Sequence, residues 1–102
     1  MLEKTNNENV PGEIIDALLT LYKKGEFEDI LVRSSQIIKH YPDTPFIHEI
    51  VGAVFFEKGK KAIAAEHFKK VTKLQPTEPH AHNNLGVALT DLEEYNEAQI
   101  NL

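Results

Sequence analysis

Apolar residues recur at helical spacing in the middle of this 102-residue chain. Ala64, Phe68 and Val71 follow an i, i+4, i+7 pattern, which places their side chains on one face of a helix. No segment alternates between apolar and polar residues as a half-buried strand would. The pattern therefore predicts an all-α protein.

Proline and glycine recur at one fixed interval. All five prolines and four of the five glycines share a spacing of 34 residues, in the sets Pro11–Pro45–Pro79, Pro42–Pro76, Gly25–Gly59 and Gly52–Gly86. Since proline makes up about 5% of average sequence, one chance match at a set offset has odds of roughly one in twenty. Several matches at the same offset indicate an internal repeat.

The repeat divides a single small domain into a leader and three helix–turn–helix units. The leader is 1–10, the complete units are 11–44 and 45–78, and an incomplete unit covers 79–102. Proline suits the first turn of a helix, and Thr44 is the expected N-cap of the middle unit. The first helices are expected to end at Lys24, Lys58 and Leu92, and the second helices to begin near Phe27, Lys61 and Tyr95.

These units resemble the tetratricopeptide repeat over residues 11–102. The matching residues of the middle unit are Val51, Gly52, Phe55, Ala64, Phe68, Val71 and Pro76, and those of the last unit are Leu85, Gly86, Leu89, Tyr95 and Ala98. The resemblance implies an α–α superhelix, or solenoid, of tandem helical hairpins. Small residues then let the two helices of a unit approach closely, namely Gly52, Ala64, Gly86 and Ala98.

The two end units depart from the family pattern. Leu18, Ile30 and Ile37 occupy positions where the family has small residues, so we expect wider helix spacing in the divergent first unit. The last unit stops within the motif, which suggests a fragment of a longer protein. A solenoid unit buries its apolar face on the next unit. We therefore expect this uncapped C-terminal end to allow a homodimer, through Leu89, Leu92, Ile100 and Leu102.

The resemblance also implies a concave groove lined by the first helix of each unit. Asn83 and Asn84 each offer amide donors and an acceptor, which suit a peptide backbone, although they could equally be solvated helix residues. Glu57 is a further groove position. The expected peptide-groove residues are Leu19, Tyr22, Phe46, Glu49, Ala53, Phe56, His80, Asn83, Asn84, Val87 and Asp91.

Charge narrows the class of partner. Eleven Lys and Arg against sixteen Asp and Glu give a net charge of −5, which suits neither nucleic acid nor an anionic membrane surface. The complete middle unit carries +2, whereas the last unit carries −4. The lysines of the middle unit either recognise an acidic partner or solvate an outer helix face, namely Lys58, Lys60, Lys61, Lys69, Lys70 and Lys73.

Candidate chemical sites are sparse. The chain has no cysteine, and His80 and His82 are two residues apart, which points them to different faces of a helix. His48 and His82 share one repeat position beside the interhelix core, where a partly buried, hydrogen-bonded imidazole is expected. Acidic pairs such as Glu93–Glu94 suit helix starts. We expect no catalytic site, metal or cofactor.

Two functions from different classes are consistent with these features. The first is a cytoplasmic protein–protein interaction module that binds a peptide or helix in the concave groove. The second is an accessory, substrate-presenting N-terminal segment of a larger enzyme, such as a glycosyltransferase or sulfotransferase. The sequence that follows Leu102 in a longer protein would separate the two.

Overall fold

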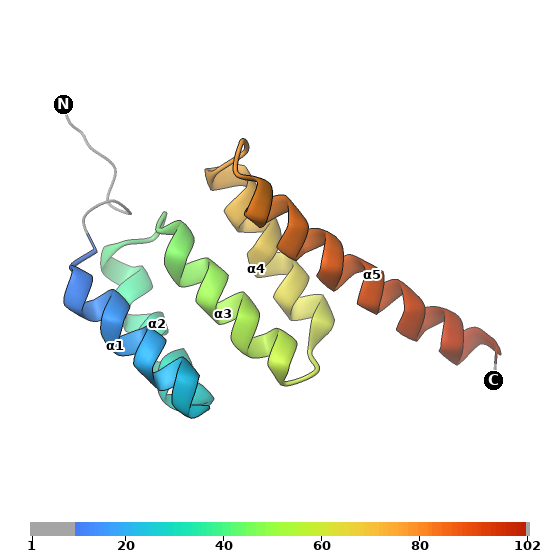
Figure 1. The fold of residues 1–102 in the computed structure, drawn as a ribbon, viewed down its shortest axis with the longest axis horizontal. Coiled ribbons are helices and arrows are strands. Elements are labelled where there is room, and N and C mark those ends of the chain that lie inside the picture. Colours follow the sequence, from blue (N-terminus) through green and yellow to red (C-terminus); the bar gives the residue numbers. More distant parts are fainter. Residues whose placement is uncertain (1–9, 102) are drawn as a thin grey trace.

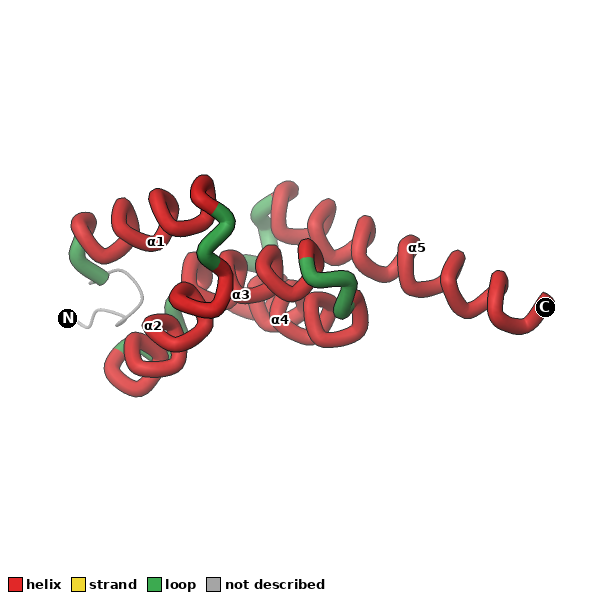
Figure 2. Tube along the Cα trace, turned by 90° about the horizontal axis from the view of Figure 1, so that it is seen from below, coloured by secondary structure: helices red, strands yellow, loops and turns green. Residues whose placement is uncertain are grey.

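The computed structural model describes the backbone of residues 10–101 and the side chains of residues 10–94 (Figure 1). This part of the chain is all-α, without a strand, and each helix packs on the next along the sequence. Figure 2 shows the same arrangement from below, with the C-terminal half of α5 extending past the other helices. The helices are α1 (Gly12–Lys24), α2 (Phe27–His40), α3 (Pro45–Glu57), α4 (Lys61–Leu74) and α5 (Pro79–Asn101).

Glycines in the left-handed conformation end α1 and α3. Gly25 has φ 75° and Gly59 has φ 81°, a region that favours residues without a Cβ atom. The Gly59 N–H donates to the Phe56 carbonyl at 3.0 Å, and the Lys60 N–H donates to the Phe55 carbonyl at 2.8 Å. This pair of bonds is a Schellman motif. The expected ends of the first four helices are confirmed to within a residue or two.

The predicted break in α5 is wrong, because the helix continues from Pro79 to Asn101 without interruption. Glu93 occupies the position 34 residues after Gly59. A residue with a side chain disfavours the left-handed conformation that stops α1 and α3. The last unit therefore forms one long helix in place of a hairpin.

A histidine stabilises the start of α3 and of α5. The His48 Nε2–H donates to the Pro42 carbonyl at 3.1 Å, and the His82 Nε2–H donates to the Pro76 carbonyl at 2.7 Å. The expected hydrogen bonds are present, with His48 half-buried and His82 exposed. Thr44 lies at the N-cap of α3 but makes no capping hydrogen bond, contrary to expectation. Its hydroxyl is buried in the protein instead, without a partner.

Helix α3 occupies the middle of the fold, and its residues contribute to two apolar clusters. The first cluster joins α1, α2 and α3, and includes the fully buried Leu18, Ile30 and Ile47. The second joins α4 and α5 through small residues and Phe68. Phe55 of α3 packs against both clusters. Packing is closest between α3 and α4 and loosest between α1 and α2.

The wider spacing expected between α1 and α2 is confirmed, and a cavity of about 260 Å³ lies between them. The sizes of one residue pair explain how this unit still packs. Leu18 and Ser34 are both 1% exposed, and they stand at the repeat positions of Gly52 and Phe68. The large residue is thus on the first helix in one unit and on the second helix in the next.

The expected close approach of helices is confirmed at Gly52 and absent at Gly86. A Cβ atom on Gly52 would lie 2.6 Å from Cε1 of Phe68, so α3 and α4 touch there. A Cβ atom on Gly86 would have nothing within 4 Å. The straight course of α5 explains the difference, since no helix folds back over Gly86. The side chain of Ala98 lies outside the described residues.

Candidate functional site

A cavity of about 210 Å³ opens on the side of the molecule where α1, α3 and α5 come together. These helices alternate along the chain, so residues far apart in the sequence share one surface. Phe68 of α4 closes the cavity from beneath, where the missing side chain of Gly52 leaves room for its ring. The lining residues are Tyr22, Glu49, Ala53, Phe56, Glu57, Phe68, Asn84 and Val87.

Tyr22 connects α1 to α3 at one side of this cavity. Its hydroxyl donates to Oε2 of Glu57 at 3.5 Å, and its ring packs on Phe27 with centroids 5.5 Å apart. Burial raises the pKa of Tyr22 above its ordinary value of 10.0, and the nearby Glu57 carboxylate raises it further. The phenol therefore remains a neutral hydrogen-bond donor throughout the physiological pH range.

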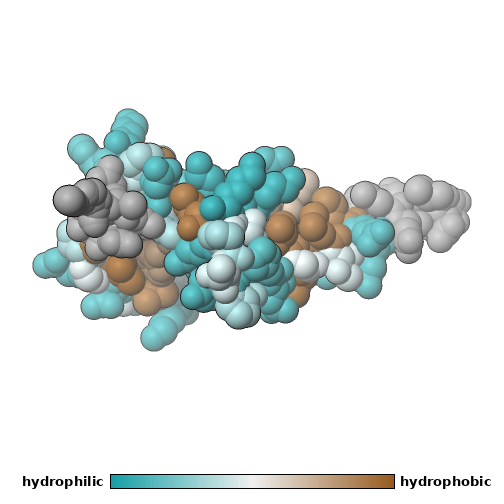
Figure 3. All heavy atoms as spheres, turned by 90° about the horizontal axis from the view of Figure 1, so that it is seen from above, coloured by the Kyte–Doolittle hydropathy of each residue, from teal (hydrophilic) through white to brown (hydrophobic). Residues whose placement is uncertain are grey.

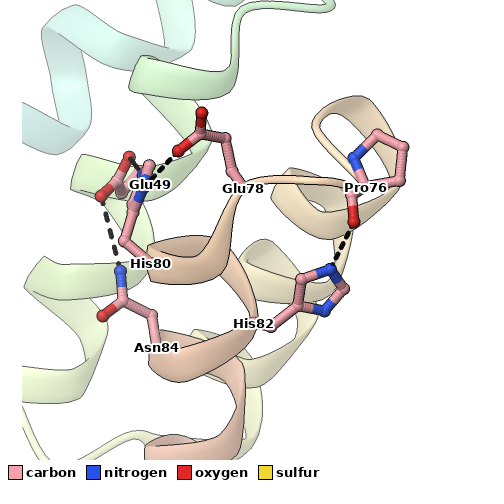
Figure 4. A network of polar contacts seen from close by, with 6 residues as sticks. All are labelled: Glu49, Pro76, Glu78, His80, His82 and Asn84. Carbon is pink, nitrogen blue, oxygen red and sulfur yellow. Dashed lines mark hydrogen bonds and ion pairs between the residues drawn. The ribbon is translucent and has the colours of Figure 1, made fainter.

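Glu49 connects α3 to α5 at the other side (Figure 4). Its Oε2 accepts from Nδ2 of Asn84 at 3.4 Å, and its Oε1 lies 3.4 Å from Nε2 of His80. The other ring nitrogen of His80 lies 3.1 Å from Oε1 of Glu78. Figure 4 shows His80 between the two carboxylates, while His82 points away from them toward Pro76. The His80 imidazole is thus placed to carry a proton between two acids.

Lys61 provides a second link between α3, α4 and α5. Its ammonium group lies 3.7 Å from the ring centroid of Phe56 and 3.6 Å from Oδ2 of Asp91. Phe56 and Asp91 stand at the repeat positions of Tyr22 and Glu57. Phenylalanine has no hydroxyl to donate, so a lysine joins the aromatic ring to the acid in this unit.

The surface of the cavity combines apolar groups with carboxylates. Ala53, Phe56 and Val87 offer apolar contact, and Val87 is 45% exposed. Glu49 and Glu57 add negative charge on either side. Such a surface suits a side chain with an apolar stem and a cationic end, because both parts then find partners.

The structure brings six of the expected groove residues to this cavity, namely Tyr22, Glu49, Ala53, Phe56, Asn84 and Val87. The remaining five lie elsewhere. Leu19 is exposed on α1, and Phe46 packs against the first apolar cluster. His80 contacts Glu49, Asp91 pairs with Lys61, and Asn83 lies in a shallower groove on α5.

Sequence analysis missed one lining residue, Phe68, which its apolar pattern placed in the core. Phe68 is 5% exposed and does belong to the second cluster. The edge of its ring nevertheless reaches the cavity, since Gly52 has no side chain to cover it. Pairing Gly52 with the aromatic residue on the facing helix was the signal that could have revealed this.

A second group of rings lies between α3 and α4, away from the cavity. His67 stacks on Phe55 with centroids 5.9 Å apart and on His48 at 5.8 Å. Burial lowers the pKa of His67 below its ordinary value of 6.5, and the neighbouring His48 lowers it further, while Glu66 acts in the opposite direction. His67 therefore belongs to the helix interface as a neutral ring.

Other classes of site were tested on the part of the chain that the structure describes. Among the side chains of residues 10–94, no three His, Asp or Glu converge to hold a metal ion. None of the five helices is both long enough and apolar enough to cross a membrane. Comparison with protein-family models, curated proteins and solved structures gives no match to this chain.

Proposed function

We propose that this chain is a protein–protein interaction module, built as a short solenoid of tetratricopeptide-like hairpins, that binds a peptide or helix in a concave groove. The cavity between α1, α3 and α5 is the observation that carries the proposal. A groove lined by alternate helices is the surface that stacked helical hairpins offer to a partner. The chain's own partner in this proposal is a protein or peptide.

Recurrence of contacts at 34-residue intervals supports the solenoid part of the proposal. The left-handed glycines Gly25 and Gly59 mark equivalent turns. The histidine-to-proline bonds at the starts of α3 and α5 are also equivalent. Repetition of such local contacts, and not of sequence alone, is expected where each unit packs on the next in the same way.

The chemistry of the cavity defines the peptide further. Its carboxylates, Glu49 and Glu57, are partly satisfied by Asn84, His80 and Tyr22, and retain oxygens free to accept from a cation. The apolar area next to them favours a bulky or long aliphatic side chain. We therefore propose a segment with a lysine or arginine beside an apolar residue as the preferred ligand.

Screening a displayed library of short peptides against the full chain tests this proposal. Peptides with a cation next to an apolar residue should be enriched, and one synthetic representative should shift the backbone amide signals of Ala53, Phe56 and Val87. Glu57→Lys should weaken its binding by about tenfold or more, because it replaces an attraction by a repulsion. Glu66→Lys is the matched control, since it makes the same charge change on the exposed side of α4.

Two results would contradict the proposal. One is an equal loss of binding in Glu57→Lys and Glu66→Lys, which would indicate a response to net charge only. The other is binding confined to the exposed lysines of α4, Lys69, Lys70 and Lys73. That second result would establish charge recognition by the outer face in place of a groove.

A further inference from the structure

Helix α5 carries a stripe of residues on which no other helix rests. His82, Gly86 and Leu89 follow one another at spacings of four and three, which aligns them along one face. His82 and Gly86 are exposed, and Leu89 is 45% exposed. We call these three residues the α5 stripe. Figure 3 shows hydrophobic atoms exposed next to the grey C-terminal end of the chain.

The equivalent stripe on α3 is fully used, and it shows what such a surface accepts. His48, Gly52 and Phe55 stand 34 residues before the three members of the α5 stripe. Gly52 meets the ring of Phe68, while His48 and Phe55 both stack on His67. The occupant of the α3 stripe is therefore a helix, α4, that lays an aromatic ring over the glycine.

The missing side chain of Gly86 leaves room for the same arrangement on α5. A groove runs along this side of the helix, lined by His82, Asn83, Gly86, Val87, Thr90 and Asp91. An added Cβ atom at Gly86 would meet nothing within 4 Å. An aromatic ring could thus approach the backbone of α5 as closely as Phe68 approaches α3.

Charge indicates which kind of helix would fill the stripe. Residues 79–102 contain four acids and no lysine or arginine. Helix α4, which already packs on the other side of α5, carries four lysines against one glutamate and pairs Lys61 with Asp91. A second copy of α5 would instead bring two acidic helices together, which opposes the homodimer expected from the sequence.

We propose that the α5 stripe is a second docking surface, distinct from the cavity between α1, α3 and α5, and that it accepts a basic amphipathic helix of a partner protein. The partner helix runs antiparallel to α5, as α4 does to α3. It places an aromatic side chain over Gly86 and its basic residues near Asp91, Glu93 and Glu94. This surface would function whether or not the cavity binds a peptide.

A synthetic peptide with the sequence of residues 60–75 is a suitable probe, because it contains the α4 helix that fills the equivalent stripe. Titrated into the full chain, it should shift the amide signals of Gly86, Leu89 and their neighbours in a saturable manner. Gly86→Leu should weaken this binding by about tenfold or more, since the added side chain fills the place of the ring. Gly12→Leu is the matched control, because Gly12 also has open space around it on another helix.

Two altered peptides test the stated chemistry. Replacing the phenylalanine of the peptide by serine should abolish binding if an aromatic ring rests on Gly86. Replacing its lysines by glutamates should weaken binding by about tenfold or more if the acids of α5 select a basic helix. Equal binding of either altered peptide would overturn the corresponding part of the proposal.

Several outcomes would overturn the docking surface itself. These are the absence of saturable shifts, shifts centred on Ala53 and Phe56 of the cavity, and binding that survives Gly86→Leu. Sedimentation of the chain alone provides the remaining test. A dimer that Gly86→Leu dissociates would show that a second copy, and not a basic helix, occupies the stripe.

Discussion

At the scale of single residues, Gly52 and Gly86 are the same amino acid at the same repeat position in opposite surroundings. Gly52→Ala should destabilise the protein by about 1–3 kcal/mol, because its Cβ atom would meet the ring of Phe68 at 2.6 Å. Gly86→Ala should stabilise it by about 0.5–1 kcal/mol, because alanine favours a helix interior and has free space there. Urea unfolding of the two variants measures both changes.

The comparison has a clear contrary outcome. Equal stabilities of the two variants would mean that α3 and α4 do not approach at Gly52. Larger substitutions extend the test, since Gly52→Leu and Ala64→Phe should overpack the same helix contact by about 1–3 kcal/mol. Ala64 is fully buried, so it cannot avoid the added volume by turning outward.

His67 should make the stability of the protein depend on pH. Its pKa in the folded chain lies below the value of 6.5 that it regains on unfolding. Between these two values the unfolded chain binds more protons than the folded one, so the free energy of unfolding rises with pH. Stability should therefore be highest above pH 6.5 and fall as the pH drops through the folded pKa.

Urea unfolding at a series of pH values tests this expectation. His67→Phe should remove most of the dependence in this window while retaining a ring between His48 and Phe55. His40→Gln serves as the control, because His40 is an exposed histidine at the end of α2. A pH dependence that persists in His67→Phe and disappears in His40→Gln would contradict the assignment.

Residue types and positions could be predicted from the sequence better than their partners could. The apolar pattern correctly buried Ala64, Phe68 and Val71. It could not reveal that Phe68 also reaches the cavity, because that depends on the glycine of the facing helix. Nor could it show that Ser34 compensates for Leu18, since each residue taken alone departs from the family pattern.

At the scale of the helices, glycine at the end of a first helix decides whether a hairpin forms. Gly59→Ala should destabilise the protein by about 1–2 kcal/mol, because φ at this position is 81° and alanine resists it. Gly12→Ala is the matched control, and it should be neutral or slightly stabilising because Gly12 has an ordinary helical setting. Thermal unfolding of both variants would show the difference, and equal midpoints would contradict the role of the Schellman motif.

The same reasoning explains which helices the sequence could predict. The first four were bounded by proline and left-handed glycine, whose effects are local and strong. The break in the last unit was expected from the repeat alone, although Glu93 had replaced the glycine that produces it. Periodicity predicts where a turn belongs, whereas the residue at that point determines whether the chain turns.

At the scale of the whole molecule, stability should be distributed unevenly along the row of helices. One apolar cluster joins α1 to α2 and α3, and another joins α4 to α5, with Phe55 in contact with both. The loosest packing lies between α1 and α2, next to a cavity of about 260 Å³. Neighbouring units that contact one another only in sequence can open separately.

Hydrogen exchange of the backbone amides should reveal this gradient. We expect the slowest exchange in α3 and α4 and faster exchange in α1, where fewer neighbours oppose opening. Leu18→Ala removes about 2–5 kcal/mol from the first cluster and should accelerate exchange mainly in α1 and α2. Phe68→Ala removes about 3–5 kcal/mol from the second cluster and should accelerate exchange mainly in α4 and α5. If both variants accelerated all five helices equally, the chain would unfold as one cooperative unit, and the two clusters would not be separable parts of its stability.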